Sequence, residues 1–312
     1  MITRSDRSMG IMAATPQTAS ATIDDCRRAA RILRETPGRL GSVVHLDSER
    51  ADDVVISADL HGHRINFTRI LRTAELRLRP RRHLILQEVC HGGPEYPGDG
   101  GCMSHLLLED VARRVIEFPG RVHFILGNHE FAELTDFPIR KGHQMLNLMF
   151  RRGTETFYGP AASSVRSAYL DFLRACPLAV RLANGVLISH SLPEPLSAPI
   201  DRKRLEQPLE ELDLTPAGPV FSMLWGRDYR PGTAEAFARA VDARVLIHGH
   251  EPCDAGFLVP NAMQIILDSS HHAACCLTVR VDEVANHRAM VERIQHLDAP
   301  EPSNGSGRPR GG

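Results

Sequence analysis

Short apolar runs that end in polar residues alternate with helical patterns through the middle of the chain. The first run, residues 54–58, is small and mostly β-branched, which is typical of a buried strand. Similar runs follow at 83–89 and 122–126, and the segments 65–74 and 103–118 between them carry apolar residues at helical spacing. This alternation predicts right-handed crossovers, a largely parallel sheet and an α/β fold.

The remaining chain extends this pattern less regularly. Helices are predicted over 24–34, 132–152, 161–176 and 233–241, and strands over 42–46 and 244–247. Ala183-Asn184-Gly185 between apolar runs predicts a hairpin, and 262–267 with 274–281 a strand pair. The proline-rich segment 193–219 is interpreted as a surface insertion. We expect one domain over 23–298, a flexible tail over 1–22 and a disordered tail over 299–312.

Side chains of metal-ligand type follow five of the predicted strands. In α/β sheets, ligands bind in the crevice at the carboxyl ends of the strands. Carboxylate, amide and imidazole groups together suit a divalent transition metal. A single histidine at a strand end is more often structural, but five such ends in series predict a metal site. The residues are Asp59 and His61, Glu88, Asn128 and His129, His190, and His248 and His250.

Composition narrows the choice of partners and compartment. With 37 basic and 38 acidic side chains, the 312-residue chain has no long-range field that would favour nucleic acid. Seven scattered cysteines form no disulfide framework, which favours a reducing compartment, and we expect the cytoplasm. No apolar stretch reaches the length of a membrane span, so no membrane partner is expected.

Several motifs resemble the calcineurin-like metallophosphoesterases, and within them the phosphoprotein-phosphatase branch. The resemblance covers roughly residues 54–281, and Gly-Asn-His-Glu after a strand is its most specific part. The matching segments are Asp59-Leu60-His61-Gly62, Gly127-Asn128-His129-Glu130, His190 after a strand, Leu224-Trp225 and Gly249-His250.

The resemblance implies two mixed β-sheets packed as a sandwich, flanked by helices, with two divalent metal ions at the strand ends. Manganese, iron and zinc all suit such ligands. Asp59 and His61 would hold the first ion, and a carboxylate would bridge both. The resemblance assigns the second ion to Asn128, His190 and His250. It also implies that His129 protonates the leaving oxygen.

The second motif departs from the family pattern. Glu88 stands where the family has a bridging Asp, and we expect it to bridge despite its extra methylene. His91 replaces the Asp that orients the acid histidine, and two imidazoles are not expected to reproduce that pairing. Gly92 replaces a phosphate-binding Arg, so Arg227 or Arg230 is a candidate substitute. Glu95 or Asp99 is a candidate partner of His129.

These observations predict metal-dependent hydrolysis of a phosphate ester, on a small molecule or a phosphoprotein. A phosphodiesterase or dinucleotide-polyphosphate hydrolase is the alternative within the same chemistry. A metal- or phosphate-binding protein with little turnover is the alternative from another class, because the altered second motif favours it. Roles for His63, His248 and His271 near the site stay open.

Overall fold

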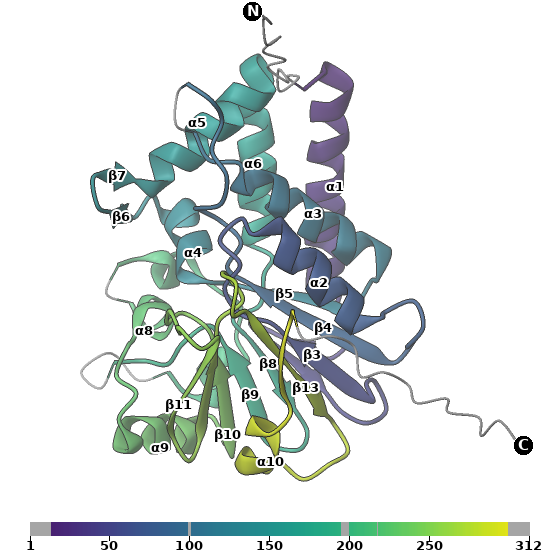
Figure 1. Ribbon diagram of the computed structural model, residues 1–312, viewed down its shortest axis with the longest axis vertical. Helices are drawn as coiled ribbons and strands as arrows, with labels where there is room; N and C mark the ends of the chain where they lie inside the picture. The colour runs from purple at the N-terminus through teal and green to yellow at the C-terminus, as the bar shows by residue number, and fades with distance from the viewer. Residues whose placement is uncertain (1–13, 99–100, 195–199, 217, 299–312) are drawn as a thin grey trace, which may run out of the picture.

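A computed structural model describes residues 14–98, 101–194, 200–216 and 218–298. Its centre is two mixed β-sheets packed face to face, with helices on their outer faces (Figure 1). This confirms the predicted α/β class and the sandwich that the resemblance implied.

The first sheet has seven strands and combines early and late parts of the chain. β8 and β9 form the predicted hairpin, and β9, β10 and β12 run parallel. Their order is β1 (Arg39–Leu40), β2 (Val43–Leu46), β8 (Ala179–Leu182), β9 (Val186–Ser189), β10 (Val245–His248), β12 (Gln264–Leu267) and β11 (Phe257–Asn261).

The second sheet has five strands, and its middle is the predicted parallel series. β3 pairs with β4 and β4 with β5, both in parallel, so their carboxyl ends share one edge. The order is β14 (Ile294–His296), β13 (Cys275–Arg280), β3 (Asp53–Ile56), β4 (Arg82–Gln87) and β5 (Val122–Ile125).

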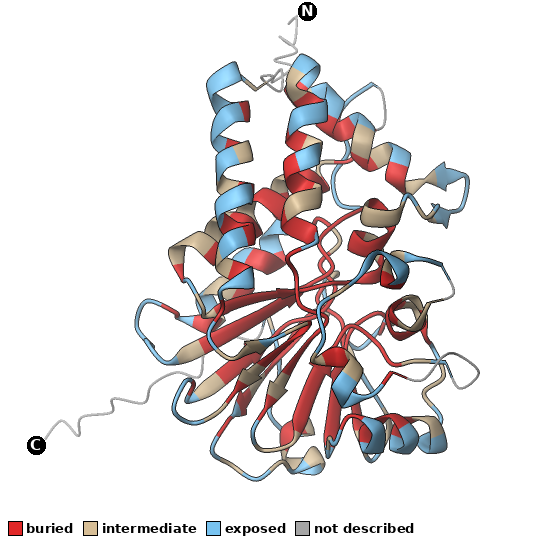
Figure 2. Cartoon of the chain, turned by 180° about the vertical axis from the view of Figure 1, so that it is seen from behind, coloured by how far each residue is buried: buried red, intermediate tan, exposed pale blue. Residues whose placement is uncertain are grey.

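The two faces of β3 serve two different cores. Val54 and Ile56 pack against the other sheet, whereas Val55 packs against helices. Alternate residues of a strand point to opposite faces, so a short run of β-branched residues fills both interiors. Figure 2 shows the result: the strands are buried along most of their length, and the helices are exposed on their outer sides.

The larger helices cover the outer face of the five-stranded sheet (Figure 1). They are α1 (Pro16–Arg34), α2 (Arg64–Ala74), α3 (Ser104–Glu117), α4 (Asn128–Thr135), α5 (Leu146–Tyr158) and α6 (Ala162–Leu173). The shorter elements are β6 (Arg140–Lys141), β7 (Gln144–Met145), η1 (Gly159–Ala161), α7 (Arg202–Leu205), η2 (Glu211–Leu214), α8 (Pro219–Trp225), α9 (Pro231–Ala240) and α10 (His287–Val291).

Three sequence-based expectations need correction. The helix predicted over 132–152 is two helices, because the chain turns at Gly142 with positive φ and forms the β6–β7 hairpin.

The second correction concerns α1, which begins at Pro16 rather than 24, since Thr15 caps it by accepting the N–H of Thr18. It therefore includes the end of the tail predicted over 1–22. Residues 1–13 and 299–312 lie outside the described chain.

The third correction concerns the strands near the C-terminus. Segments 262–267 and 274–281 do form strands, but β12 joins the seven-stranded sheet and β13 the five-stranded one. β12 pairs with β10 and β11, whereas β13 pairs antiparallel with β3. Adjacency in sequence suggested a pair, and long-range packing decided otherwise. Among the described residues, no helix is long and apolar enough to cross a membrane.

Candidate metal centre

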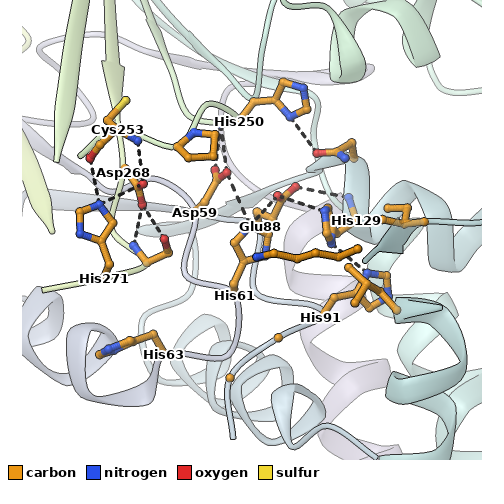
Figure 3. Close-up of a pocket in the computed structure, with 18 of the residues that line it drawn as sticks. Asp59, His61, His63, Glu88, His91, His129, His250, Cys253, Asp268 and His271 are labelled. Carbon is orange, nitrogen blue, oxygen red and sulfur yellow. Dashed lines mark hydrogen bonds and ion pairs between the residues drawn. The ribbon is translucent and has the colours of Figure 1, made fainter. Parts of the chain in front are cut away.

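The strand ends of both sheets converge on one pocket, as Figure 3 shows. β3, β4 and β5 bring residues from the five-stranded sheet, and β9 and β10 bring residues from the seven-stranded one. Six of the predicted ligands and the predicted acid histidine are gathered here: Asp59, His61, Glu88, Asn128, His129, His190 and His250.

Glu88 lies between two sets of imidazoles. Its Oε1 is 3.3 Å from His61 Nε2 and 3.8 Å from His129 Nε2. Its Oε2 is 3.0 Å from His190 Nε2. The side chain is buried. Each carboxylate oxygen therefore faces a different group of nitrogen atoms.

The backbone at the site adopts an uncommon conformation at several non-glycine residues. φ is 42° at His61, 41° at Glu88, 63° at His91 and 69° at His250. Non-glycine residues with positive φ are uncommon and cost energy, and they cluster at functional sites. Here they follow strand ends, where they turn side chains toward the shared pocket.

Two further groups that can bind a cation lie beside His190. His190 Nε2 is 2.8 Å from Asn128 Oδ1 and 3.1 Å from His250 Nδ1. Its other nitrogen, Nδ1, is 3.0 Å from Gln87 Oε1. An amide oxygen only accepts, so Nδ1 carries a proton and donates it to Gln87, and Nε2 is the nitrogen that would bind a cation.

Asp59 is held by the backbone that follows β10. Its two carboxylate oxygens accept the N–H of His250 at 3.0 and 3.1 Å. A Cβ at Gly249 would collide with this carboxylate, and one at Gly127 would lie 2.6 Å from Glu88 Oε2. The glycines of the Gly-Asn-His-Glu and Gly-His motifs therefore leave room for the two carboxylates.

Burial and mutual charge shift the protonation of the whole cluster. Burial and the neighbouring Glu88 charge raise the pKa of Asp59 to about 7. Burial opposes ionisation of Glu88, but the imidazoles of His190 and His129 outweigh it and hold its pKa well below the usual range. Burial lowers the pKa of His190, yet the two carboxylates overcome this and raise it to about 9. The site attracts positive charge.

The donor atoms fit divalent cations. Two groups of ligand atoms, each within 4.8 Å, share Glu88: one holds His61 and His129, the other Asp59 and His190. The second group lies beside Asn128 Oδ1 and His250 Nδ1. This grouping differs from the implied one, which pairs Asp59 with His61. Their atoms Asp59 Oδ2 and His61 Nε2 are 3.9 Å apart.

The predicted residues outside this cluster fall in different places. Arg227 lines the pocket and forms an ion pair with Glu251. Arg230 pairs with Asp228 and does not line the pocket. His91 is buried behind His129, with 2.9 Å between their Nδ1 atoms, so two imidazoles do pair here.

The other candidates are accounted for by local structure. Glu95 is exposed and has no contact with His129 among the described residues, and Asp99 lies outside them. His63 caps α2 by accepting the N–H of Asn66, while its ring also lines the pocket. His271 lines it beside Asp268. His248 is buried against Ser189 and does not line the pocket.

Three positioning residues escaped the sequence analysis. Gln87 orients His190, and Glu130 Oε1 accepts the N–H groups of Val89 and Cys90 and so fixes the chain after Glu88. Glu133 contacts His91 at 3.0 Å. Two of them had a readable signal: Glu130 closes the Gly-Asn-His-Glu motif, and Glu133 lies four residues after His129, on the same face of α4.

Two packed sheets with carboxylate, amide and imidazole groups at their strand ends define a metal-dependent phosphoesterase. The chain belongs to the calcineurin-like phosphoesterases, whose sequence profile matches residues 53–254, well over half of its length. A search of curated protein sequences found no match.

Solved structures share the fold at low identity. A protein serine/threonine phosphatase from Saccharomyces cerevisiae, with similarity to human phosphatase PP5, superposes with a TM-score of 0.64 at 14% identity. The match covers 92% of this chain and 91% of that one. A cold-active protein-tyrosine phosphatase of a psychrophilic Shewanella species gives 0.53 at 14% identity, covering 84% of each chain. At this identity the likeness concerns the fold alone.

Proposed function

We propose that the chain hydrolyses phosphate esters with two divalent metal ions, for both of which Glu88 would be a ligand. The observation that carries this proposal is that the two oxygens of Glu88 face different ligand residues, Oε1 facing His61 and Oε2 facing His190, which lies beside Asn128. When bound, two divalent cations lower the pKa of a water for attack on phosphorus and offset the charge that develops on the phosphoryl oxygens.

Within this proposal, Asp59, His61, Glu88, Asn128, His190 and His250 are the metal ligands. Their mixed nitrogen and oxygen donors suit manganese, iron or zinc, and manganese is our first choice. His129 donates a proton from Nε2 to the leaving oxygen as the P–O bond breaks and its electron pair passes to that oxygen. The ring lines the pocket, with its side chain 14% exposed.

Arg227 is the proposed cation for the substrate phosphate. Gly92 brings no side chain to the pocket where the family has an arginine, and Arg227 lines the same pocket. Glu251 now neutralises its guanidinium, so a phosphate must compete with that carboxylate. Arg230 is less suited, because Asp228 holds it outside the pocket lining.

The substrate is a phosphorylated small molecule or protein, and the proposed compartment is the cytoplasm. All seven cysteines are free, which agrees with a reducing environment. Hydrolysis of diesters is the second candidate, and the missing arginine favours it. A monoester dianion gains more from two guanidinium clamps than a diester with one negative charge does.

The test is metal analysis of protein prepared with manganese, followed by hydrolysis assays on p-nitrophenyl phosphate and bis-p-nitrophenyl phosphate. The proposal expects two ions per chain and turnover of at least one substrate. The ratio of the two rates separates monoester from diester preference. Bound metal without turnover would favour the binding protein, and protein without metal would refute the dinuclear centre.

A further inference from the structure

A line of three side chains leads from the pocket into the protein interior, and its last member is Glu133. His91 Nδ1 is 2.9 Å from His129 Nδ1, and His91 Nε2 is 3.0 Å from Glu133 Oε1. The side chains of His91 and Glu133 are 0% and 1% exposed. Neither belongs to the two ligand groups that share Glu88.

We propose that Glu133 acts through His91 to position His129 for proton donation to the leaving group. The proposal rests on the proposed phosphoesterase function. The family pattern has an aspartate beside the acid histidine. Here the negative charge belongs to Glu133, which lies behind His91, and His91 connects Glu133 to His129.

We call this His129–His91–Glu133 line the relay. Donor and acceptor chemistry fixes the direction of its hydrogen bond between His91 and Glu133. A carboxylate accepts only, so His91 Nε2 carries a proton and donates it to Glu133. One further proton joins the two Nδ1 atoms. A donor at His129 Nε2 then requires a third proton on the two rings, which gives the pair one positive charge. Glu133 offsets that charge on the side away from the pocket.

The surroundings make Glu133 suited to this role. It lies four residues after His129 in α4, so both side chains leave the same helix face and His91 fits between them. Asn147 Nδ2 donates to the same Oε1 at 3.2 Å, which holds the carboxylate in place. Arg166 approaches Oε2 at 3.7 Å without a hydrogen bond. Figure 3 shows His91 next to His129, away from Asp268 and His271.

The leaving-group dependence of Glu133→Gln tests the relay. Phenyl phosphate needs protonation of its leaving oxygen much more than p-nitrophenyl phosphate does. The substitution keeps the shape and an acceptor oxygen but removes the charge. We expect kcat/KM for phenyl phosphate to fall about tenfold more than for p-nitrophenyl phosphate, within the range of general acid catalysis. Metal content should not change.

The chain contains a matched control. Glu109 is also a buried carboxylate that accepts from a buried imidazole, His105 Nδ1 at 3.2 Å, but it does not line the pocket. Glu109→Gln should leave the ratio of the two kcat/KM values at the wild-type value. A rescue variant adds His91→Asp to Glu133→Gln, which returns a carboxylate to the side of His129 and should restore the ratio.

The outcomes separate the relay from the function on which it rests. An equal fall on both substrates in Glu133→Gln, with metal retained, would overturn the relay and leave the hydrolase intact. Wild-type protein that binds no metal and turns over neither substrate would overturn the function itself. If Glu133→Gln does not fold, His91→Gln makes the same test, because it keeps an acceptor for His129 and breaks the contact with Glu133.

Discussion

β4 and β5 carry buried imidazoles near one end and ligand-type residues at the other. Near the start of these strands, His83 Nδ1 lies 2.9 Å from His123 Nε2, and the rings stack. No carboxylate hydrogen-bonds to this pair among the described residues. Burial lowers the pKa of His83 to about 4 and that of His123 well below its usual range. Both rings are neutral at pH 7.

At the carboxyl ends, the pKa values of His61 and His190 are raised instead, although burial still lowers those of His129 and His250. Burial again disfavours the charged ring of His190, but Glu88 and Asp59 overcome it and raise the pKa to about 9. The comparison teaches that buried histidines alone do not form a cation site. Ionised carboxylates are needed as well, because their negative charge makes the strand ends attractive to positive charge.

Glu88→Gln should have the largest effect of the single changes. It preserves the shape but removes the charge that faces both ligand groups, so we expect loss of at least one metal ion and a fall in kcat on the order of 100-fold or more. Glu88→Asp should be intermediate, because it keeps the charge and shortens the reach. Metal analysis and steady-state kinetics give both answers.

The matched control for Glu88→Gln is His123→Phe, which alters the imidazole pair at the opposite end of the sheet. Metal content and kcat should stay at wild-type values there. If Glu88→Gln also kept both, the bridging carboxylate would lie elsewhere and the contrast between the two ends would fail.

Metal removal should lower the free energy of unfolding of the protein, because the proposed ligands at the carboxyl ends of the strands then lose the ions that they bind. The buried imidazoles at the other end should not contribute to this loss. A ligand present at 100 times its Kd stabilises the folded state by about 2.7 kcal/mol. Urea unfolding with manganese and with a chelator should show a difference of this order in the wild type. The difference should persist in His123→Phe and shrink in Glu88→Gln. An equal gain in both variants would mean that manganese binds outside the proposed centre.

The strand ends could be predicted from the sequence because local pattern determines them. Asp59, Glu88 and Asn128 follow apolar runs whose period and length indicate strands, and parallel pairing brings their ends together. The pairing of β12 and β13 could not be predicted, because it depends on packing between distant segments. Gln87 and Glu133 escaped for a related reason: each acts on a histidine that only the folded chain brings near.

The opposite end of the sheet should produce an acid-dependent loss of stability. His83 has a folded pKa of about 4 against an ordinary value of 6.5, so between these values the unfolded chain binds a proton that the folded chain does not. Stability is therefore lost as pH falls from about 6.5 to 4, by on the order of 3 kcal/mol. His83→Phe should flatten this part of the curve.

Urea unfolding at pH 7.5 and pH 4.5 measures that change. The exposed His143 supplies the control, since His143→Gln removes an imidazole without altering the core. A wild-type slope in His83→Phe would mean that the acid sensitivity arises from other buried imidazoles whose pKa burial lowers, such as His129 and His250 at the strand ends.

The smallest effect is expected at the rim of the pocket, where charged side chains are partly exposed to solvent. Arg227 is about half exposed and already paired with Glu251, so replacing it removes one charged hydrogen bond to phosphate and frees one carboxylate. Arg227→Ala should lower kcat/KM about tenfold, in line with about 1.5 kcal/mol for such a bond. Arg230→Ala, where Asp228 holds the guanidinium outside the pocket lining, should change nothing.

Glu251→Gln should raise phosphate affinity by releasing Arg227. If Arg227→Ala and Glu251→Gln both leave the kinetics unchanged, the metal ligands alone hold the phosphate, and the contrast between the two ends of the sheet then lies entirely in Asp59 and Glu88.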